Sequence, residues 1–364
     1  MTLTVLTIIA LLAVLIDLVA LILWKEASCE YVFPSESPPI SILIPMRNEE
    51  SNVSGIISCI KSLDYPKHKI EILIGEDRSE DQTRMALNKE IALDSRFKVI
   101  PIREDIPGLV AKANVIAQLI PYCNTRYYYI TDADVRVPCT WINALLPYSD
   151  NQTGVIGGTT VVETKDLWSG LQNIDWLLAQ ALLHVVGTVG STVAVSGTNM
   201  MITKVACAAI GGYQNIPYAL TEDIGFLTAA RNHGFSAKTV VNKQALARIR
   251  AQPSWSDLLK QRTRWIYGAL RLPKPLVFLL LVRTLFLLML ILIIWWRPLT
   301  VVGLYSMKIL IDWVLVNRVA TKLEQKLSLK YFLCFEAFSF LISTGGLIKY
   351  IFSTNITWKG RNYQ

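Results

Sequence analysis

Long apolar runs at both ends of the chain constrain its fold more than any other feature. Residues 1–24 are apolar apart from a few threonines and one charge, Asp17, and such a run is long enough to cross a bilayer. A cleaved signal peptide would carry an early positive charge, but the first basic residue is Lys25. Further apolar runs lie at residues 276–296, 299–317 and 331–352. We therefore expect a membrane protein whose middle part folds in water.

Charged residues in and beside these runs predict how the chain sits in the membrane. Lys25 follows the first run, and a basic segment at residues 318–330 separates the last two. The positive-inside rule places both on the cytoplasmic side, with the middle part. If residues 331–352 cross fully, the tail lies outside, so a re-entrant or interfacial segment in the last two runs is an alternative. Asp17 is expected to face another helix, and Lys308 and Asp312 are spaced to pair.

Composition argues against several classes of protein. The formal net charge is +8, and the basic residues gather beside apolar runs, which suits an anionic membrane surface. We expect no nucleic-acid partner, because no nucleic-acid-binding motif is present. The six cysteines form no C-x-x-C pair, which argues against a zinc site or a disulfide framework. The three histidines are dispersed and give little support to a Ser/His/Asp triad.

Short apolar strands alternate with helices in the first half of the middle part. Strands are expected at residues 40–45, 70–75, 97–102 and 126–130, with helices at residues 52–63, 82–93 and 110–120. This alternation predicts a parallel sheet with right-handed crossovers. Ligands bind such sheets at the carboxyl ends of the strands. After residue 138 the pattern changes to a strand at 155–162, a Trp- and Leu-rich helix at 166–186 and a helix that begins at Ser254.

Two carboxylates follow the last of these strands, at Asp132 and Asp134. If the chain turns there, both can converge on one point and hold a hard divalent cation, with water or substrate phosphates as the other ligands. An ordinary exposed turn is the alternative, because Asp also favours turns for local hydrogen bonding.

In their order and spacing, the motifs of the chain resemble those of membrane-bound family 2 glycosyltransferases, which have the GT-A fold. The matching motifs are residues 45–49, the loop around Asp77 and Asp81, Lys112 with Asn114, Asp132 with Asp134, the triplet 221–223 and QRTRW at 261–265. The resemblance covers residues 40–271 and the flanking apolar runs. Non-processive lipid-modifying members similar to ceramide glucosyltransferase fit better than long polysaccharide synthases, because the membrane part is small.

The resemblance implies an α/β protein with a mixed, mainly parallel sheet and flanking transmembrane helices. The implied domains are an N-terminal anchor (1–24), a linker (25–39), a cytoplasmic GT-A domain (40–252), an interfacial helix with QRTRW (253–272), C-terminal membrane helices (276–353) and a basic tail (354–364). We expect an integral membrane protein of a bacterial inner membrane.

The implied activity is that of a metal-dependent hexosyltransferase that moves a sugar from a nucleotide-sugar donor, expected to be a UDP-sugar, to a membrane lipid acceptor. Mg²⁺ or Mn²⁺ on Asp134, with Asp132 on the metal or the ribose, would neutralise the leaving pyrophosphate. Glu49 and Asp77 would contact the base and ribose, and Lys112 would also bind the donor. A processive polysaccharide synthase and a non-catalytic nucleotide-sugar-binding scaffold are the alternatives.

The resemblance also implies a base for the acceptor hydroxyl. Asp223 is the candidate, with Glu222 beside it, although acids are also common in the first turn of a helix. A single base without a carboxylate nucleophile implies one inverting displacement. Where the family pattern has glycine, this chain has Arg78, which requires an allowed backbone there and adds a cation near the donor.

The helix that begins at Ser254 carries further candidates on one face, at i, i+3 and i+4. Arg264 can bind diphosphate oxygens in a bidentate fork. Gln261 binds phosphate or faces solvent. Trp265 stacks on the acceptor or packs at the membrane interface. In the preceding segment, Asn199 lines the acceptor cleft or belongs to a plain turn.

Overall fold

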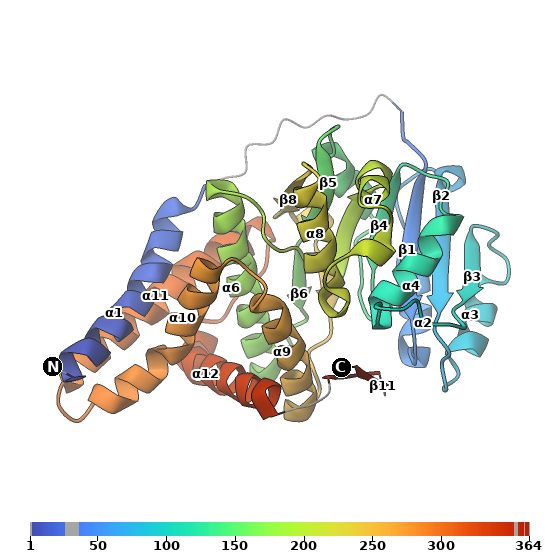
Figure 1. The fold of residues 1–364 in the computed structure, drawn as a ribbon. Coiled ribbons are helices and arrows are strands. Elements are labelled where there is room, and N and C mark those ends of the chain that lie inside the picture. The colour runs from blue at the N-terminus through green and yellow to red at the C-terminus, as the bar shows by residue number, and fades with distance from the viewer. Residues whose placement is uncertain (1, 26–35, 353–355, 360, 364) are drawn as a thin grey trace.

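A seven-stranded sheet lies at the centre of the middle domain (Figure 1). The computed structural model describes residues 2–25, 36–352, 356–359 and 361–363. The strands lie in the order β3-β2-β1-β4-β7-β5-β8, and β7 runs antiparallel to both of its neighbours while the other pairs are parallel. Their bounds are β1 Ile40–Met46, β2 Ile70–Glu76, β3 Phe97–Pro101, β4 Tyr127–Thr131, β5 Thr153–Gly158, β7 Asn199–Thr203 and β8 Ser236–Val240. The predicted mixed, mainly parallel sheet is confirmed.

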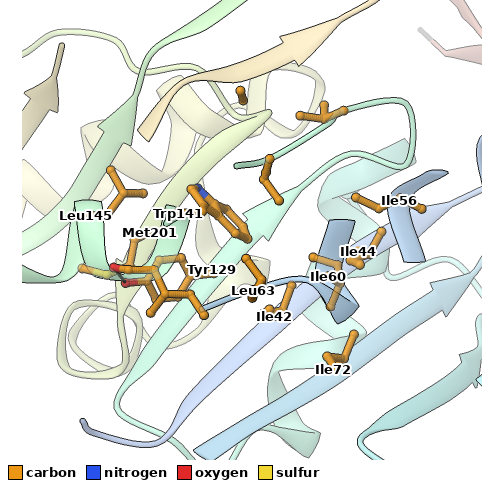
Figure 2. Close-up of a cluster of buried hydrophobic side chains, with 14 of the residues drawn as sticks. Ile42, Ile44, Ile56, Ile60, Leu63, Ile72, Tyr129, Trp141, Leu145 and Met201 are labelled. Carbon is orange, nitrogen blue, oxygen red and sulfur yellow. Dashed lines mark hydrogen bonds between the residues drawn. The ribbon is translucent and has the colours of Figure 1, made fainter. Parts of the chain in front are cut away.

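Alternate side chains of the strands pack into two separate hydrophobic cores, one on each face of the sheet. Ile42 and Ile44 of β1 pack with Ile56 and Ile60 of α2 on one face (Figure 2), whereas Leu43 belongs to the core of the other face. Fully burying one such side chain contributes about 1.5–3 kcal/mol, which explains why every residue of this central strand is apolar, small or hydrogen-bonded. The covering helices are α2 Glu50–Lys61, α3 Thr83–Ile91 and α5 Trp141–Leu145 on the first face and α4 Ala111–Leu119, α7 Lys204–Ala209 and α8 Glu222–Asn232 on the second.

Among the described residues, four helices are long and apolar enough to cross a membrane. They are α1 Thr2–Leu23, α10 Lys274–Ile293, α11 Pro298–Lys322 and α12 Leu329–Phe352. The helix α1 packs against α10 and α11 (Figure 1), and leucine and isoleucine side chains such as Ile22, which is 71% exposed, point outward. Such an apolar exterior suits contact with lipid tails.

A buried group of charges connects these four helices. Asp17 of α1 pairs with Arg283 of α10 and lies 2.9 Å from Lys308 of α11. Lys308 also pairs with Asp312 and lies 3.0 Å from Glu336 of α12. Opposite charges that pair with one another are the common way to accommodate ionised groups at membrane depth. The expected helix partner of Asp17 and the expected pair of Lys308 and Asp312 are both present.

Helices α6 Leu167–Val189 and α9 Trp255–Ala269 lie between the sheet and the apolar helices. Helix α12 packs on both (Figure 1): the ring of Tyr331, near its start, lies against Gly170 of α6, and its Gly346 faces Arg262 of α9. The tail residue Arg361 then pairs with Asp77 of the middle domain. Contacts at both ends hold α12 against α6 and α9, and the pairing of Arg361 with Asp77 places the tail against the middle domain; the interfacial alternative for this run stays a prediction. Most of the expected linker, residues 26–35, lies outside the described residues.

Candidate active site

The chain turns immediately after β4 and brings the expected carboxylate pair together. The amide of Val135 donates to the carbonyl oxygen of Asp132 at 3.2 Å, which closes the turn around Ala133 and Asp134. Asp132 and Asp134 both line one cavity. The turn that was needed for their convergence is therefore present.

Lys112, at the start of α4, is the centre of the charged network. Its Nζ lies 2.7 Å from Oδ1 of Asp132 and 3.1 Å from Oε1 of Glu222, and it donates to the carbonyl oxygen of Gly197 at 2.7 Å. Burial alone lowers the pKa of Lys112, but the charges of Asp132 and Glu222 outweigh it and raise the pKa. Lys112 was expected to bind the donor, and in this structure it joins a carboxylate of the loop after β4, Asp132, to one at the start of α8, Glu222.

Glu222 and Asp223 are the first residues of α8. Asp223 is held at both carboxylate oxygens, because Oδ2 accepts from the Gly197 amide at 3.0 Å and Oδ1 from the Ile224 amide at 2.8 Å. Burial raises the pKa of Asp223, although these hydrogen bonds and Lys112 act against the rise. Burial also raises the pKa of Glu222, to about 7. A fixed carboxylate with a raised pKa is suited to accept a proton near neutral pH.

Asp134 has an acidic neighbourhood that suits a cation. Its side chain is exposed to the cavity, yet the protein surrounds it closely enough that desolvation, followed by the charges of Asp132 and Glu49, raises its pKa to about 6. A divalent cation would relieve this repulsion. Within the described ranges no group of three or more His, Cys, Asp and Glu side chains gathers around a point. The two carboxylates Asp132 and Asp134 fit an ion such as Mg²⁺, which takes one or two carboxylates and completes its shell with water and phosphate oxygens.

The QRTRW segment presents its predicted face to the same cavity. Gln261, Arg264 and Trp265 of α9 all line it. Burial lowers the pKa of Arg264, while the nearby charges of Asp132 and Glu222 act to raise it, so this guanidinium faces the acids. The ring of Trp265 meets Trp176 of α6 edge-on, with centroids 4.9 Å apart. Trp265 therefore also serves packing between α6 and α9.

The loops after β1 and β2 hold the acids that were expected to contact the base and ribose. Glu49 and Asp77 are 7% and 1% exposed. Glu49 lies 2.7 Å from Nζ of Lys359, and Asp77 lies 2.8 Å from Nη1 of Arg361. Sequence reasoning did not find these partners in the tail, since no spacing connects residues about 300 positions apart. Arg78 has a φ of 54°, the left-handed conformation that its place in a glycine position requires.

Asn199 does not reach the cavity, which corrects its assignment to the acceptor cleft. It is fully buried at the start of β7. Its Oδ1 accepts from Nε1 of Trp141 at 2.8 Å, and its Nδ2 donates to the carbonyl oxygens of Thr159 and Ala245 at 2.9 and 2.8 Å. With these bonds made inside the core, Asn199 is structural. The preceding residues 196–198 do line the cavity.

The cavity has a volume of about 760 Å³ and joins the acidic site to the apolar helices. At one end it is lined by Asp132, Asp134, Glu222 and Asp223. At the other end α1, α10 and α12 contribute mainly apolar side chains, together with Ser339, Ser343 and the paired charges Arg283, Lys308 and Glu336. A ligand with a polar head and an apolar body fits such a shape.

A GT-A sheet with a carboxylate pair at the end of β4, next to helices that can enter a membrane, defines a membrane-associated glycosyltransferase. The chain belongs to glycosyl transferase family 21, whose profile matches residues 3–364. This confirms the resemblance to membrane-bound lipid glycosyltransferases that the motifs indicated.

Known proteins of this kind are similar over much of the chain. A beta-monoglucosyldiacylglycerol synthase of Synechocystis sp. is 23% identical over 237 residues, which are 64% of this chain and 48% of that protein. A probable glycosyltransferase of Bacillus subtilis, YdaM, is 24% identical over 238 residues, or 64% of this chain and 56% of that protein. The chain thus spans about half the length of these curated relatives. A solved mannosyltransferase of Pyrobaculum calidifontis shares the fold, with a TM-score of 0.63, 16% identity and coverage of 96% of this chain and 99% of that one.

Proposed function

We propose that this protein transfers a hexose from a nucleotide-sugar, with a UDP-sugar as the expected donor, to the hydroxyl group of a membrane lipid, with inversion at the anomeric carbon. The observation that carries this proposal is the continuous cavity from the acidic site to α1, α10 and α12. The polar end accommodates a charged donor, and the apolar end accommodates lipid chains.

The donor would occupy the acidic end of the cavity. Asp134 and Asp132 would hold Mg²⁺ or Mn²⁺, which, when bound, neutralises charge on the diphosphate leaving group. Arg264 faces the same space and would bind diphosphate oxygens through its planar fork. Gln261 would add a neutral hydrogen bond to the donor. Lys112 would keep Asp132 oriented, since its Nζ lies 2.7 Å from that carboxylate.

Asp223 would act as the base. The acceptor oxygen would attack the anomeric carbon from the face opposite the diphosphate, and its proton would pass to the Asp223 carboxylate as the bond between carbon and phosphate oxygen breaks. The electron pair of that bond would leave with the nucleoside diphosphate. Hydrogen bonds from the Gly197 and Ile224 amides fix the orientation of Asp223, and Glu222 would be held beside it by Lys112.

Relatives support a nucleotide-sugar as the donor class, a divalent metal ion and a lipid acceptor. The name of the Synechocystis relative specifies glucosyl transfer to a diacylglycerol, and the Pyrobaculum neighbour is solved in complex with GDP-Man and Mn²⁺. The basic segment at residues 318–330 favours a cytoplasmic site.

A processive polysaccharide synthase is the second candidate. A poly-beta-1,6-N-acetyl-D-glucosamine synthase of Staphylococcus epidermidis is 25% identical over 271 residues, or 68% of this chain and 62% of that protein. A synthase of this kind would yield a polymer, whereas the lipid enzyme yields a glycolipid carrying one sugar. A non-catalytic scaffold would bind donor and yield neither.

One assay separates these functions. The purified protein would be incubated with UDP-glucose, UDP-N-acetylglucosamine or GDP-mannose, with Mn²⁺ or Mg²⁺ and a membrane lipid extract, and the products analysed by mass spectrometry. We expect a lipid heavier by one hexose, formed from a UDP-sugar. A polymer would favour the synthase, and donor binding without a product would favour the scaffold.

A further inference from the structure

The C-terminal hairpin lies next to the donor loops, far from its place in the sequence. Strand β10 (Ile356–Trp358) pairs antiparallel with β11 (Arg361–Tyr363), and β10 contacts α9 (Figure 1). The function proposed above gives this hairpin no role.

The hairpin is fixed to the loops after β1 and β2. Nη1 of Arg361 lies 2.8 Å from Oδ2 of Asp77, a carboxylate with 1% exposure. Nε of Arg47 donates to the carbonyl oxygen of Lys359 at 3.2 Å, and its Nη1 donates to the carbonyl oxygen of Asp77 at 2.8 Å. Arg47 is itself buried. The same two buried residues thus hold the donor loops together and hold the hairpin onto them.

This attachment places one flexible cation at the donor end of the cavity. Nζ of Lys359 lies 2.7 Å from Oε1 of Glu49, and Lys359 lines the cavity together with Asp132, Asp134 and Arg264. Its side chain is 31% exposed. An ammonium group on a long stem can turn from a carboxylate to a phosphate oxygen without any movement of the backbone.

The position of Lys359 suits an anionic ligand. Lys112 is held by two carboxylates, Asp132 and Glu222, whereas Lys359 pairs with one, Glu49. A diphosphate that enters this acidic cavity needs positive charge in addition to the proposed metal ion and Arg264. Charge-assisted hydrogen bonds from lysine to phosphate are among the stronger polar contacts that a site can offer.

We infer that the C-terminal hairpin completes the donor site, with Lys359 as a residue that binds the diphosphate of the nucleotide-sugar and Arg361 as a positioning residue that pins the hairpin to Asp77. This inference rests on the proposed function. It also revises the roles of Glu49 and Asp77: both hold the hairpin, and Glu49 releases Lys359 when the donor binds.

The test measures nucleotide affinity in the full-length protein. UDP and GDP, each with Mn²⁺ and with Mg²⁺, would be titrated into wild type, Lys359→Met, Lys359→Arg, Arg361→Met and a matched control, Lys67→Met. Lys67 is an exposed lysine in the short 3-10 helix before β2, outside the cavity. We expect Lys359→Met to raise the Kd of the nucleotide that binds wild type about tenfold or more, since bonds to charged groups are the costly ones to lose. Lys359→Arg should stay within about threefold and Lys67→Met should match wild type.

Arg361→Met should weaken nucleotide binding by a similar factor, because the hairpin loses its ion pair with Asp77. Lys359→Met leaves the Glu49 carboxylate without its ammonium partner, so some loss of stability is expected; a cooperative unfolding transition well above the assay temperature excludes misfolding as the cause of weaker binding. In the transferase assay Lys359→Met should raise the KM for the donor more than it lowers kcat.

Distinct outcomes would overturn distinct statements. Unchanged affinity in Lys359→Met, with a wild type that binds nucleotide, overturns the role of Lys359 and leaves the proposed function standing. Tighter binding would overturn it as well, and would show that the hairpin obstructs the site. Unchanged affinity in Arg361→Met overturns the role of Arg361 in positioning the hairpin. A wild type that binds neither nucleotide with Mn²⁺ or Mg²⁺ refutes the proposed function itself.

Discussion

At the scale of single residues, the proposed base and the proposed metal ligands differ in how the protein holds them. Asp223 accepts two backbone amides, while Asp134 projects into the cavity beside Glu49 and Asp132. Both carboxyl groups have a raised pKa, but only Asp223 is locked in one orientation. A fixed orientation suits proton transfer. A carboxylate that is exposed to the cavity and repelled by neighbouring carboxylates is suited to bind a metal ion.

Asp223→Asn should abolish transfer and preserve donor binding. The amide keeps the size of the carboxylate but cannot take the acceptor proton, so we expect kcat to fall by about 10²–10⁴-fold. Titration with UDP and Mn²⁺ should give a Kd within about threefold of wild type, a change of under 1 kcal/mol. Asp64→Asn, an exposed acid outside the cavity, is the control. Full activity in Asp223→Asn would contradict the base assignment.

Asp134→Ala should abolish metal-dependent donor binding. Removal of this carboxylate takes away a proposed ligand of Mn²⁺ or Mg²⁺, and the loss of a metal-bridged diphosphate contact should raise the Kd for UDP at least tenfold, about 1.4 kcal/mol. Calorimetry with Mn²⁺ and with a chelator checks this. If wild type binds UDP equally well in both conditions, the metal assignment is wrong whatever the variant does.

The sequence could predict which residues form the site only where those residues are close together in the chain. Asp132 and Asp134 converge because a turn follows their strand, a local event that the sequence signals. Asn199 looked like a cleft residue, yet its position at the start of β7 turns its side chain toward Trp141. Lys359 and Arg361 reach Glu49 and Asp77 through a hairpin whose docking depends on tertiary packing.

At the scale of elements, α9 joins the site to the membrane-facing helices. Ser254 caps its start by accepting from the Asp257 amide at 3.1 Å, and Arg262 pairs with Asp175 of α6. Its residues 261, 264 and 265 share one face because of helical spacing, which the sequence predicts. The helix that packs on it could not be predicted, because the apolar run that becomes α12 has the same composition whether it crosses a bilayer or lies along the domain.

Gly346 lets α12 approach α9 closely, so Gly346→Ala should lower both stability and activity. The added methyl carbon would lie 2.6 Å from Cγ of Arg262 and 3.0 Å from Cδ1 of Ile266, and overpacking of this kind costs about 1–3 kcal/mol. Thermal unfolding in detergent should show a lower melting temperature.

Gly303→Ala in α11 is the matched control, since open space surrounds its position and alanine gains about 0.8–1 kcal/mol over glycine within a helix. It should leave the melting temperature unchanged or raise it. A melting temperature for Gly346→Ala that rises as much as that for Gly303→Ala would contradict the tight contact between α12 and α9.

At the scale of the whole molecule, buried ion pairs hold the apolar helices together, and the cavity connects these helices to the acidic site beside the sheet. Lys308 joins α11 to α1 and α12 through Asp17 and Glu336. Removing one partner of such a buried pair is strongly destabilising, so these contacts fix where the helices lie around the cavity. The sequence predicts the charges and one pair along a helix, whereas the contacts between helices depend on how the four apolar runs pack.

A bulky side chain at the apolar end of the cavity should prevent binding of the lipid acceptor and leave binding of the donor unchanged. Ser343 of α12 lines this end, whereas Leu341 on the same helix is 53% exposed to the outside. In Ser343→Trp the indole would occupy space meant for lipid chains, so we expect glycolipid formation to fall at least tenfold while the Kd for UDP with Mn²⁺ stays within about threefold. Leu341→Trp places the same bulk on the outer face and should keep wild-type transfer. If Ser343→Trp transfers sugar to lipid as well as Leu341→Trp does, the acceptor does not use this cavity, and the hydroxyl group must reach Asp223 by another route.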